Sequence, residues 1–236
     1  MNLNNGKRGK LIISDLSQFW FDLKWIYPSA FNKIFSKWKL SVICLFLILS
    51  AFFLDEAVYT FVISIKSGFW DSVFAFGRWF GNGNPTLYAF AGLYLIGIFF
   101  QRNKIRDAGL LAGESFVFAG FITILFKSFF GRWRPFTNHG DMSFYGFTWS
   151  DNDHLSFSSG HANVAFCLST VLASTTDNIY LKILYYIPAF ITAISRIYHN
   201  QHWLSDVLVG ALIAVLITKV LISFHKTGAR FSRSNA

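Results

Sequence analysis

The sequence predicts an all-α protein that crosses a membrane six times, and three observations support this fold class. Hydrophobic residues make up 53% of the 236 residues, whereas charged residues make up only 14%. Soluble domains usually contain about 25% charged residues. The apolar residues gather into six segments, and most basic residues fall on one side of the membrane that these segments would cross.

The first part of the chain, residues 1–39, is basic and aromatic, and we expect it to lie on the membrane surface. The stretch "LSQFWFDLKWIYPSAFNKIFSKW" (16–38) mixes bulky rings with lysines. Interfacial helices bury such rings among the lipid headgroups and leave their amines in water. A flexible basic tail is the alternative. No apolar stretch follows the first basic residues closely enough for a cleavable signal peptide.

Six apolar segments lie within residues 40–226, the predicted membrane domain: 40–54, 86–100, 108–126, 161–174, 180–194 and 204–224. A bilayer core about 30 Å thick needs roughly twenty helical residues. The third and sixth segments nearly reach this length, and the second, fourth and fifth need residues from their flanks. Pro188 would kink the fifth segment, which neighbouring helices tolerate.

Residues 56–85 are apolar but are interrupted by Lys66, Asp71 and Arg78. This pattern favours short amphipathic helices on the outer membrane surface over a seventh span. "GNGNP" (81–85) then predicts a turn before the second span.

The distribution of basic residues predicts the orientation. Six spans place both termini, including the tail 227–236, on one side with loops 101–107 and 174–182. That side carries fourteen basic residues against six on the other. The positive-inside rule therefore puts both termini in the cytoplasm. The net charge of +9 then faces anionic lipids rather than nucleic acid. We expect a bacterial inner (plasma) membrane.

Cys44 and Cys167 both lie in apolar runs and are interpreted as small packing residues rather than a disulfide.

Polar residues gather in three loops that six alternating spans bring to the outer face. These are "KSFFGRWRP" (127–135), "SFSSGHA" (156–162) and "SRIYHNQHWLSD" (195–206). Lys127, Arg134 and Arg196 are fixed cations, and a guanidinium can contact two phosphate oxygens at once. Ser159 and Gly160 lead into a helix, whose free amides and dipole favour an anion. The three loops therefore predict a phosphate site.

The third loop also carries a candidate nucleophile. His202 and Asp206 are four residues apart, so they share one face if the last helix begins by His202. A carboxylate that accepts one imidazole N–H leaves the other ring nitrogen free to attack. His161 in the second loop could protonate a leaving alkoxide. This chemistry needs no metal and no cofactor.

At these positions the sequence resembles the type 2 phosphatidic acid phosphatase family. "K-x6-RP" (127–135), "SSGH" (158–161) and "SR-x5-H-x3-D" (195–206) are similar to its three signature motifs. The resemblance implies that His202 forms a phosphohistidine, Asp206 orients it and His161 is the general acid. It also implies that Lys127, Arg134, Ser159, Gly160 and Arg196 hold the phosphate. Ser158 replaces the usual proline of the second motif, which frees the backbone but removes no catalytic group.

The resemblance implies an integral membrane phosphatase whose substrate is a lipid phosphate or pyrophosphate. Undecaprenyl pyrophosphate and phosphatidylglycerol phosphate are favoured, and phosphatidic acid and the 1-phosphate of lipid A are further candidates. Two rival functions are a membrane transporter that binds phosphate without turnover and a haloperoxidase-like vanadate site. The membrane spans disfavour the vanadate site. An oriented nucleophile with an acid favours an enzyme over a transporter.

For several polar residues, the sequence is consistent with two different roles. His199 and His202 could be metal ligands with Asp206, although no second cluster of ligands supports this. Arg132 could bind a substrate head group or face solvent or lipid. Glu114, inside the third span, favours protonation or a hydrogen bond between helices.

Four histidines remain, and all are interpreted as surface residues: His139, His154, His199 and His225. His154 lies just before the second motif, so lining the pocket is its alternative.

Overall fold

The computed structural model describes residues 3–149 and 151–234, and within them all regular secondary structure is helical apart from one isolated β-bridge. Its helices are α1 (Leu3–Ser36), α2 (Trp38–Ser64), α3 (Gly68–Phe80), α4 (Gly83–Phe99), α5 (Asn103–Phe130), α6 (Gly160–Ser174), α7 (Ile179–Tyr198) and α8 (Leu204–Ser234). Two short 3-10 helices, η1 (Pro135–Thr137) and η2 (Asn152–His154), lie between α5 and α6. The all-α prediction is confirmed.

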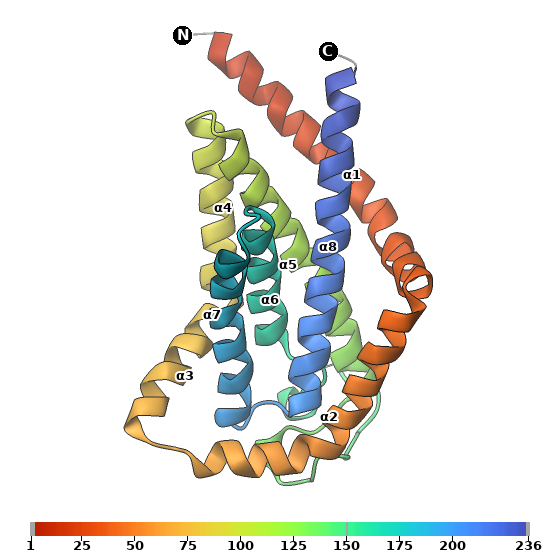
Figure 1. Ribbon diagram of the computed structural model, residues 1–236, viewed down its shortest axis with the longest axis vertical. Helices are drawn as coiled ribbons and strands as arrows, with labels where there is room; N and C mark the ends of the chain where they lie inside the picture. The colour runs from red at the N-terminus through yellow and green to blue at the C-terminus, as the bar shows by residue number, and fades with distance from the viewer. Residues whose placement is uncertain (1–2, 150, 235–236) are drawn as a thin grey trace.

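Helix α6 lies inside the bundle and packs against α5, α7 and α8 (Figure 1). Most of its residues are buried, and several are small, including Ala162, Ala165 and Cys167. Small side chains allow helix backbones to approach closely where lipid supplies no hydrophobic driving force between helices. Cys44 and Cys167 are both free, as predicted.

Each of the six predicted apolar segments lies almost entirely within one helix, but the helices differ in length. Three of the described helices are long and apolar enough to cross a membrane: α2, α5 and, over Leu204–Lys226, α8. Helices α4, α6 and α7 have 17, 15 and 20 residues. The membrane character is therefore confirmed, whereas six complete crossings stay a prediction.

Residues 56–64 differ from the prediction. They continue α2 instead of forming a separate amphipathic helix, because no helix-breaking residue follows Asp55 before Ser64. Asp55 is fully buried within the bundle. The helix therefore continues past this carboxylate instead of ending there. The second half of the predicted surface segment does form its own helix, α3.

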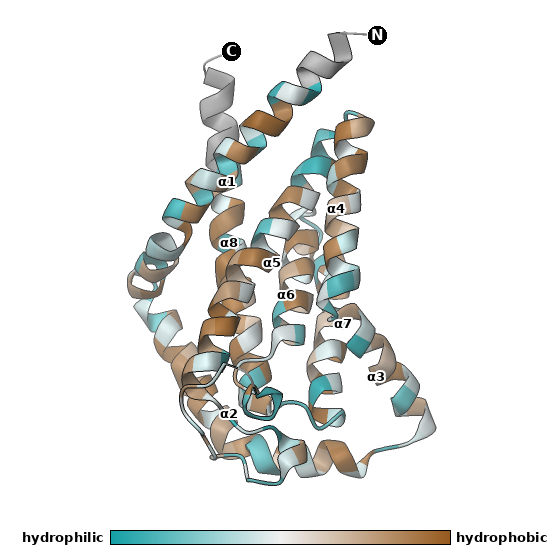
Figure 2. Ribbon diagram, turned by 180° about the vertical axis from the view of Figure 1, so that it is seen from behind, coloured by the Kyte–Doolittle hydropathy of each residue, from teal (hydrophilic) through white to brown (hydrophobic). Residues whose placement is uncertain are grey.

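Many large apolar side chains face outward, as expected of a protein surrounded by lipid. Phe46, Phe53 and Phe61 on α2 expose 67%, 89% and 65% of their surface. Helices α4 and α5 are also largely hydrophobic (Figure 2), and their exposed side chains include Leu95 and Phe121. Large exposed apolar areas are rare on soluble monomers, so these faces are lipid contacts.

Both termini lie at one end of the bundle, and the loops between α5 and α6 and between α7 and α8 lie at the other (Figure 1). Gly131 ends α5 with φ +55°, a conformation that glycine adopts readily. A Cβ there would lie 2.0 Å from the Gly146 carbonyl oxygen. This close approach directs the chain from α5 into the loop that carries the first motif.

Helix α1 is joined to the bundle by a buried polar cluster. The Nε2 atom of His225 on α8 lies 2.6 Å from Glu114 of α5 and 3.2 Å from Asp22 of α1. The hydrogen bond predicted for Glu114 is therefore present. The prediction of a surface role for His225 is wrong, because α1 covers this part of α8.

Candidate active site

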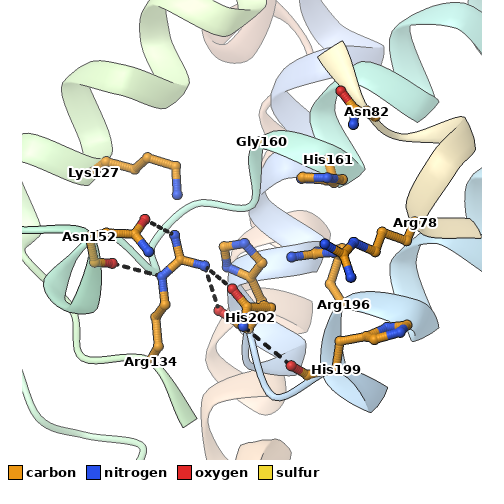
Figure 3. Close-up of a pocket in the computed structure, with 11 residues that line it drawn as sticks. Arg78, Asn82, Lys127, Arg134, Asn152, Gly160, His161, Arg196, His199 and His202 are labelled. Atoms are coloured by element: carbon orange, nitrogen blue, oxygen red, sulfur yellow. Dashed lines mark hydrogen bonds between the residues drawn. The ribbon is translucent and has the colours of Figure 1, made fainter. Parts of the chain in front are cut away.

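A cavity of about 490 Å³ lies between the α5–α6 loop, the α7–α8 loop and the start of α6. Most predicted site residues line it (Figure 3). Six of the eight do so: Lys127, Arg134, Gly160, His161, Arg196 and His202. They come from the end of α5, the following loop, the start of α6, the end of α7 and the loop before α8. The structure thus brings the three motifs together around one space.

Lys127 lies in the last turn of α5 and reaches across to the second motif. Its Nζ donates hydrogen bonds to the carbonyl oxygens of Leu155 and Ser156. These bonds hold the ammonium group at the cavity wall. They leave donor capacity for an anion, because an ammonium carries three N–H groups.

Arg134 is held by Asn152 in η2 and by Gln201 in the loop before α8. Its Nε and Nη2 donate to the carbonyl and side-chain oxygens of Asn152, each at 2.8 Å, and its Nη1 donates to Gln201 Oε1 at 2.8 Å. Asn152 and Gln201 also line the cavity. The sequence analysis missed both residues, because an amide side chain carries no charge and has no catalytic role that would single it out.

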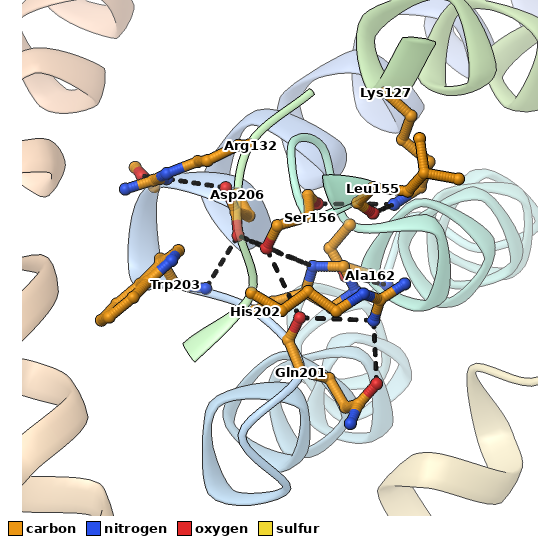
Figure 4. Close-up of polar contacts among 12 residues, drawn as sticks. Lys127, Arg132, Leu155, Ser156, Ala162, Gln201, His202, Trp203 and Asp206 are labelled. Carbon is orange, nitrogen blue, oxygen red and sulfur yellow. Dashed lines mark hydrogen bonds and ion pairs between the residues drawn. The ribbon is translucent and has the colours of Figure 1, made fainter. Parts of the chain in front are cut away.

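His202 is buried in the loop just before α8, which begins at Leu204, so the condition that this helix begin by His202 is not met. Its Nδ1 lies 3.6 Å from Asp206 Oδ2 and 3.5 Å from Ser156 Oγ (Figure 4). Burial holds the pKa of His202 well below its usual value of 6.5, and the positive charges of Lys127 and Arg134 lower it further, against the opposing effect of Asp206. The ring is therefore neutral at pH 7.

Asp206 lies behind His202 rather than in the cavity wall. Its Oδ2 accepts hydrogen bonds from the Trp203 amide at 2.8 Å and from Ser156 Oγ. Its Oδ1 accepts a 2.7 Å hydrogen bond from Arg132. These contacts fix the carboxylate in place, so it can orient the imidazole.

Arg132 neither binds a head group nor faces solvent or lipid, so both interpretations of this residue are wrong. Its side chain is fully buried and forms ion pairs with Asp206 and with Asp55 of α2, each at 2.7 Å. Asp55 also accepts hydrogen bonds from Ser205, at 2.8 Å from its amide and 2.6 Å from its hydroxyl. The sequence hides this network because Asp55 lies far from the motifs.

The start of α6 has the geometry expected of an anion site. Ser159 is the N-cap residue, and its Oγ accepts a hydrogen bond from the Ala162 amide at 3.4 Å. Its own amide donates to the Asp206 carbonyl at 2.9 Å. Ser159 does not line the cavity, whereas Gly160 and His161 do. The backbone amides of the first turn are thus the part of this motif closest to an anion.

Residues that the three motifs do not specify complete the cavity. Arg78 from α3, Asn82 before α4 and His199 after α7 also line it. The prediction of a surface role for His199 is therefore wrong. Its Nδ1 lies 2.7 Å from the Ser195 carbonyl oxygen, which turns that nitrogen away from the cavity.

The remaining histidines lie outside the cavity lining. His154 is buried against Trp133 and Tyr145, so neither a surface position nor a place in the cavity wall describes it. His139 is exposed and stacks on Trp133 with ring centroids 3.7 Å apart.

A metal site of His199, His202 and Asp206 lacks support in the donor geometry. Among the described residues, three potential ligand atoms come within 4.8 Å of one another only at Asp22, Glu114 and His225, in the cluster that joins α1 to the bundle.

The fold and the cavity define a class of membrane protein. A family model described as the PAP2 superfamily matches residues 108–230, and the chain belongs to this superfamily. This confirms the family that the three motifs indicate. Arg78 and Asn82 lie outside the matched residues.

Two solved structures share the fold. The crystal structure of Aquifex aeolicus LpxE aligns with a TM-score of 0.55 and 24% identity, over 72% of this chain and 95% of that one. The crystal structure of a transmembrane PAP2 type phosphatidylglycerolphosphate phosphatase from Bacillus subtilis aligns with a TM-score of 0.58 and 21% identity, over 91% and 96% of the two chains.

One curated relative matches in sequence. The lipid A 1-phosphatase of Porphyromonas gingivalis is 39% identical over 64 residues, which is 26% of this chain and 14% of that protein. The match therefore spans only a small part of that relative.

Proposed function

We propose that the protein hydrolyses a lipid phosphate or pyrophosphate through a phosphohistidine at His202, in a cavity that faces the outer (periplasmic) side of the membrane. One observation carries the proposal. The neutral imidazole of His202 lies in the wall of a cavity that also presents Lys127, Arg134 and Arg196. A nucleophile within a cationic pocket is the arrangement that phosphoryl transfer requires.

In the first step, the Nδ1–H of His202 faces Asp206, which leaves the lone pair of Nε2 to attack phosphorus. The bond between phosphorus and the leaving oxygen breaks, and its electron pair moves to that oxygen. His161 lies on the other side of the cavity from His202 (Figure 3). Burial and the positive charges of Arg196 and Lys127 disfavour the protonated form of His161. The negative charge of the bound phosphate offsets those cations, so that His161 holds the proton that it donates to the leaving group.

In the second step, water attacks the phosphohistidine. His161 takes a proton from this water, the N–P bond breaks, and its electron pair returns to Nε2. Inorganic phosphate leaves. Throughout both steps, Lys127, Arg134 and Arg196 stabilise the charge on the phosphoryl oxygens.

The apolar outer faces of the helices support a lipid as the substrate, since its tail can remain among them while the phosphate enters the cavity. Undecaprenyl pyrophosphate and phosphatidylglycerol phosphate are the favoured substrates. The 1-phosphate of lipid A is the alternative substrate, and the similarity to the lipid A 1-phosphatase of Porphyromonas gingivalis supports it. A transporter that only binds phosphate would not need His202 to be oriented by Asp206.

The test is phosphate release by the purified protein from a panel of lipid phosphates and pyrophosphates in detergent. We expect His202→Ala to lower the rate by more than about a thousandfold. His139→Ala is the matched control, because this histidine is exposed and outside the cavity lining. A radiolabelled intermediate that survives alkali but not acid would identify the phosphohistidine. Full activity of His202→Ala would exclude it as the nucleophile.

The proposed mechanism is metal-independent, and a chelator tests this separately. We expect EDTA to leave phosphate release by the unmodified protein unchanged. Loss of activity that a divalent ion restores would contradict the mechanism, and the His202 variant would then show whether the histidine acts as a ligand instead.

A further inference from the structure

We propose that Arg78 and Asn82 form, with Arg196, a second anion subsite in the cavity, which holds the leaving-side phosphate of a diphosphate lipid. Arg196 serves both subsites, since the proposed function also assigns it to the transferred phosphoryl group. The inference rests on the proposed function and adds to it the substrate class. Two of the subsite's residues, Arg78 and Asn82, lie in α3 and in the turn into α4, which the family model does not cover.

The cavity has two cationic sides. Figure 3 shows Lys127 and Arg134 on one side of His202, and Arg78 and Arg196 on the other. The charge of Arg78 acts on both Arg196 and His161, so the guanidinium group of Arg78 lies within electrostatic reach of these two side chains. A phosphate held by Lys127 and Arg134 would therefore have its leaving group directed towards Arg78.

The second cationic side carries charge that no carboxylate balances. Among the described residues, neither Arg78 nor Arg196 forms an ion pair. Arg196 is only 5% exposed, and its buried Nε has no hydrogen-bond partner in the described part of the chain. The Asp206 carboxylate lies outside the cavity lining and is paired with Arg132 at 2.7 Å. Two adjacent like charges with an unpaired buried donor favour a bound anion.

Close helix packing fixes Arg78 beside Arg196. A Cβ on Gly77 would lie 2.7 Å from the Ile191 carbonyl oxygen, and Thr192 Oγ1 donates to the Gly77 carbonyl at 2.8 Å. Helix α3 therefore lies directly on α7, the helix that carries Arg196.

The same packing continues at the end of α3. A Cβ on Gly81 would lie 2.8 Å from the His161 carbonyl oxygen. The next residue, Asn82, uses its Oδ1 to accept the Asn84 amide at 3.1 Å. Its side-chain NH₂ remains as a donor at the cavity wall, close to His161 (Figure 3). The subsite is thus built at a fixed position relative to the general acid.

The reaction of a diphosphate balances in this arrangement. His202 Nε2 forms a bond to the terminal phosphorus, and the bond from that phosphorus to the bridging oxygen breaks. The electron pair moves to the bridging oxygen, so the leaving lipid monophosphate gains negative charge beside Arg78 and Arg196. Water then releases inorganic phosphate from the histidine, as in the proposed function.

The experiment compares farnesyl phosphate with farnesyl diphosphate, which share one tail, in detergent with purified protein. We expect Arg78→Gln to lower kcat/KM for the diphosphate by about tenfold to a hundredfold, the usual effect of losing a charge-assisted hydrogen bond. The monophosphate should be affected far less. Arg78→Lys should recover only part of the loss, because an ammonium lacks the guanidinium fork.

Lys66→Gln is the matched control. Lys66 is exposed, precedes the same helix and lies outside the cavity lining, so its loss removes equal charge without touching the subsite. We expect it to leave both rates unchanged. Inorganic pyrophosphate should also inhibit monophosphate hydrolysis more strongly than inorganic phosphate does, and Arg78→Gln should abolish this difference.

The outcomes separate this inference from the proposed function. Equal losses on both substrates in Arg78→Gln, or no loss on either, would overturn the subsite and leave the phosphatase intact. If the unmodified protein hydrolysed the monophosphate but not the diphosphate, the subsite would also be overturned and the phosphatase would stand. Hydrolysis of neither these probes nor any lipid of the panel would overturn both proposals.

Discussion

Arg132 and Asp206 form an ion pair of 2.7 Å in which neither side chain exposes any surface to solvent. The same guanidinium lies 2.7 Å from Asp55, so one cation joins carboxylates of α2 and α8. Removing one member of a buried ion pair commonly costs about 3–5 kcal/mol, because a charge is left without compensation. This network holds Asp206 beneath His202, and it makes the orienting carboxylate depend on a residue far outside the motifs.

We therefore expect Asp55→Asn to lower both thermal stability and activity. The amide keeps the shape of the side chain but leaves Arg132 with one buried carboxylate instead of two. The midpoint of thermal unfolding in detergent should fall clearly below that of the unmodified protein, and phosphate release should fall at temperatures where the variant is still folded. Asp177→Asn serves as the control, because Asp177 is exposed. An unchanged midpoint for Asp55→Asn would show that Arg132 needs only Asp206.

The pH dependence of kcat/KM should follow His202. Burial and the neighbouring cations hold its pKa well below 6.5, so the imidazole stays neutral as the pH falls through 6.5. Because kcat/KM reports the free enzyme, its acid limb should have a midpoint below pH 6.5. A midpoint at or above 6.5 that belongs to His202 would contradict the buried, cation-flanked environment of this residue.

The same pKa affects stability, with a definite sign. Below about pH 6.5 the unfolded chain binds a proton at His202 that the folded protein does not bind. The contribution of His202 to the free energy of unfolding is therefore greatest above this pH and decreases as the pH falls. Removing the histidine in His202→Ala should reduce this part of the pH dependence of the unfolding midpoint.

Gly210→Ala should reduce activity by displacing the start of α6. A Cβ at Gly210 would lie 2.5 Å from the Ser159 carbonyl oxygen, so α8 and the second motif must separate. Displacements near 1 Å at a catalytic site can cost about a hundredfold in rate. Steady-state hydrolysis by the purified variant measures the effect. Gly120→Ala is the control, since nothing lies within 4 Å of its Cβ position. Equal rates for both variants would show that this contact does not position Gly160 and His161.

Much of the site was predictable because its residues follow local patterns. Lys127 and Arg134 share one motif, and His202 and Asp206 share another, so spacing along the chain is enough to recognise them. Alternation of apolar segments predicts that the motifs meet at one end of the bundle, and the cavity lining agrees.

The rest depends on contacts between distant parts of the chain. Arg78 lines the same cavity as Arg196 because Gly77 allows α3 to lie on α7. The interpretation of Arg132 fails for the same reason, since its partner Asp55 lies on another helix. The interpretation of His225 fails because α1 brings Asp22 to it.

By itself, the sequence determined the helical class, the membrane character, the family and the residues of the three motifs. These follow from composition and from short-range spacing, which the chain carries in any conformation. Only the tertiary structure decided which charges are paired and which face the cavity. That outcome depends on the close approach of helix backbones at small residues, and no periodicity in a single segment records which helices will meet.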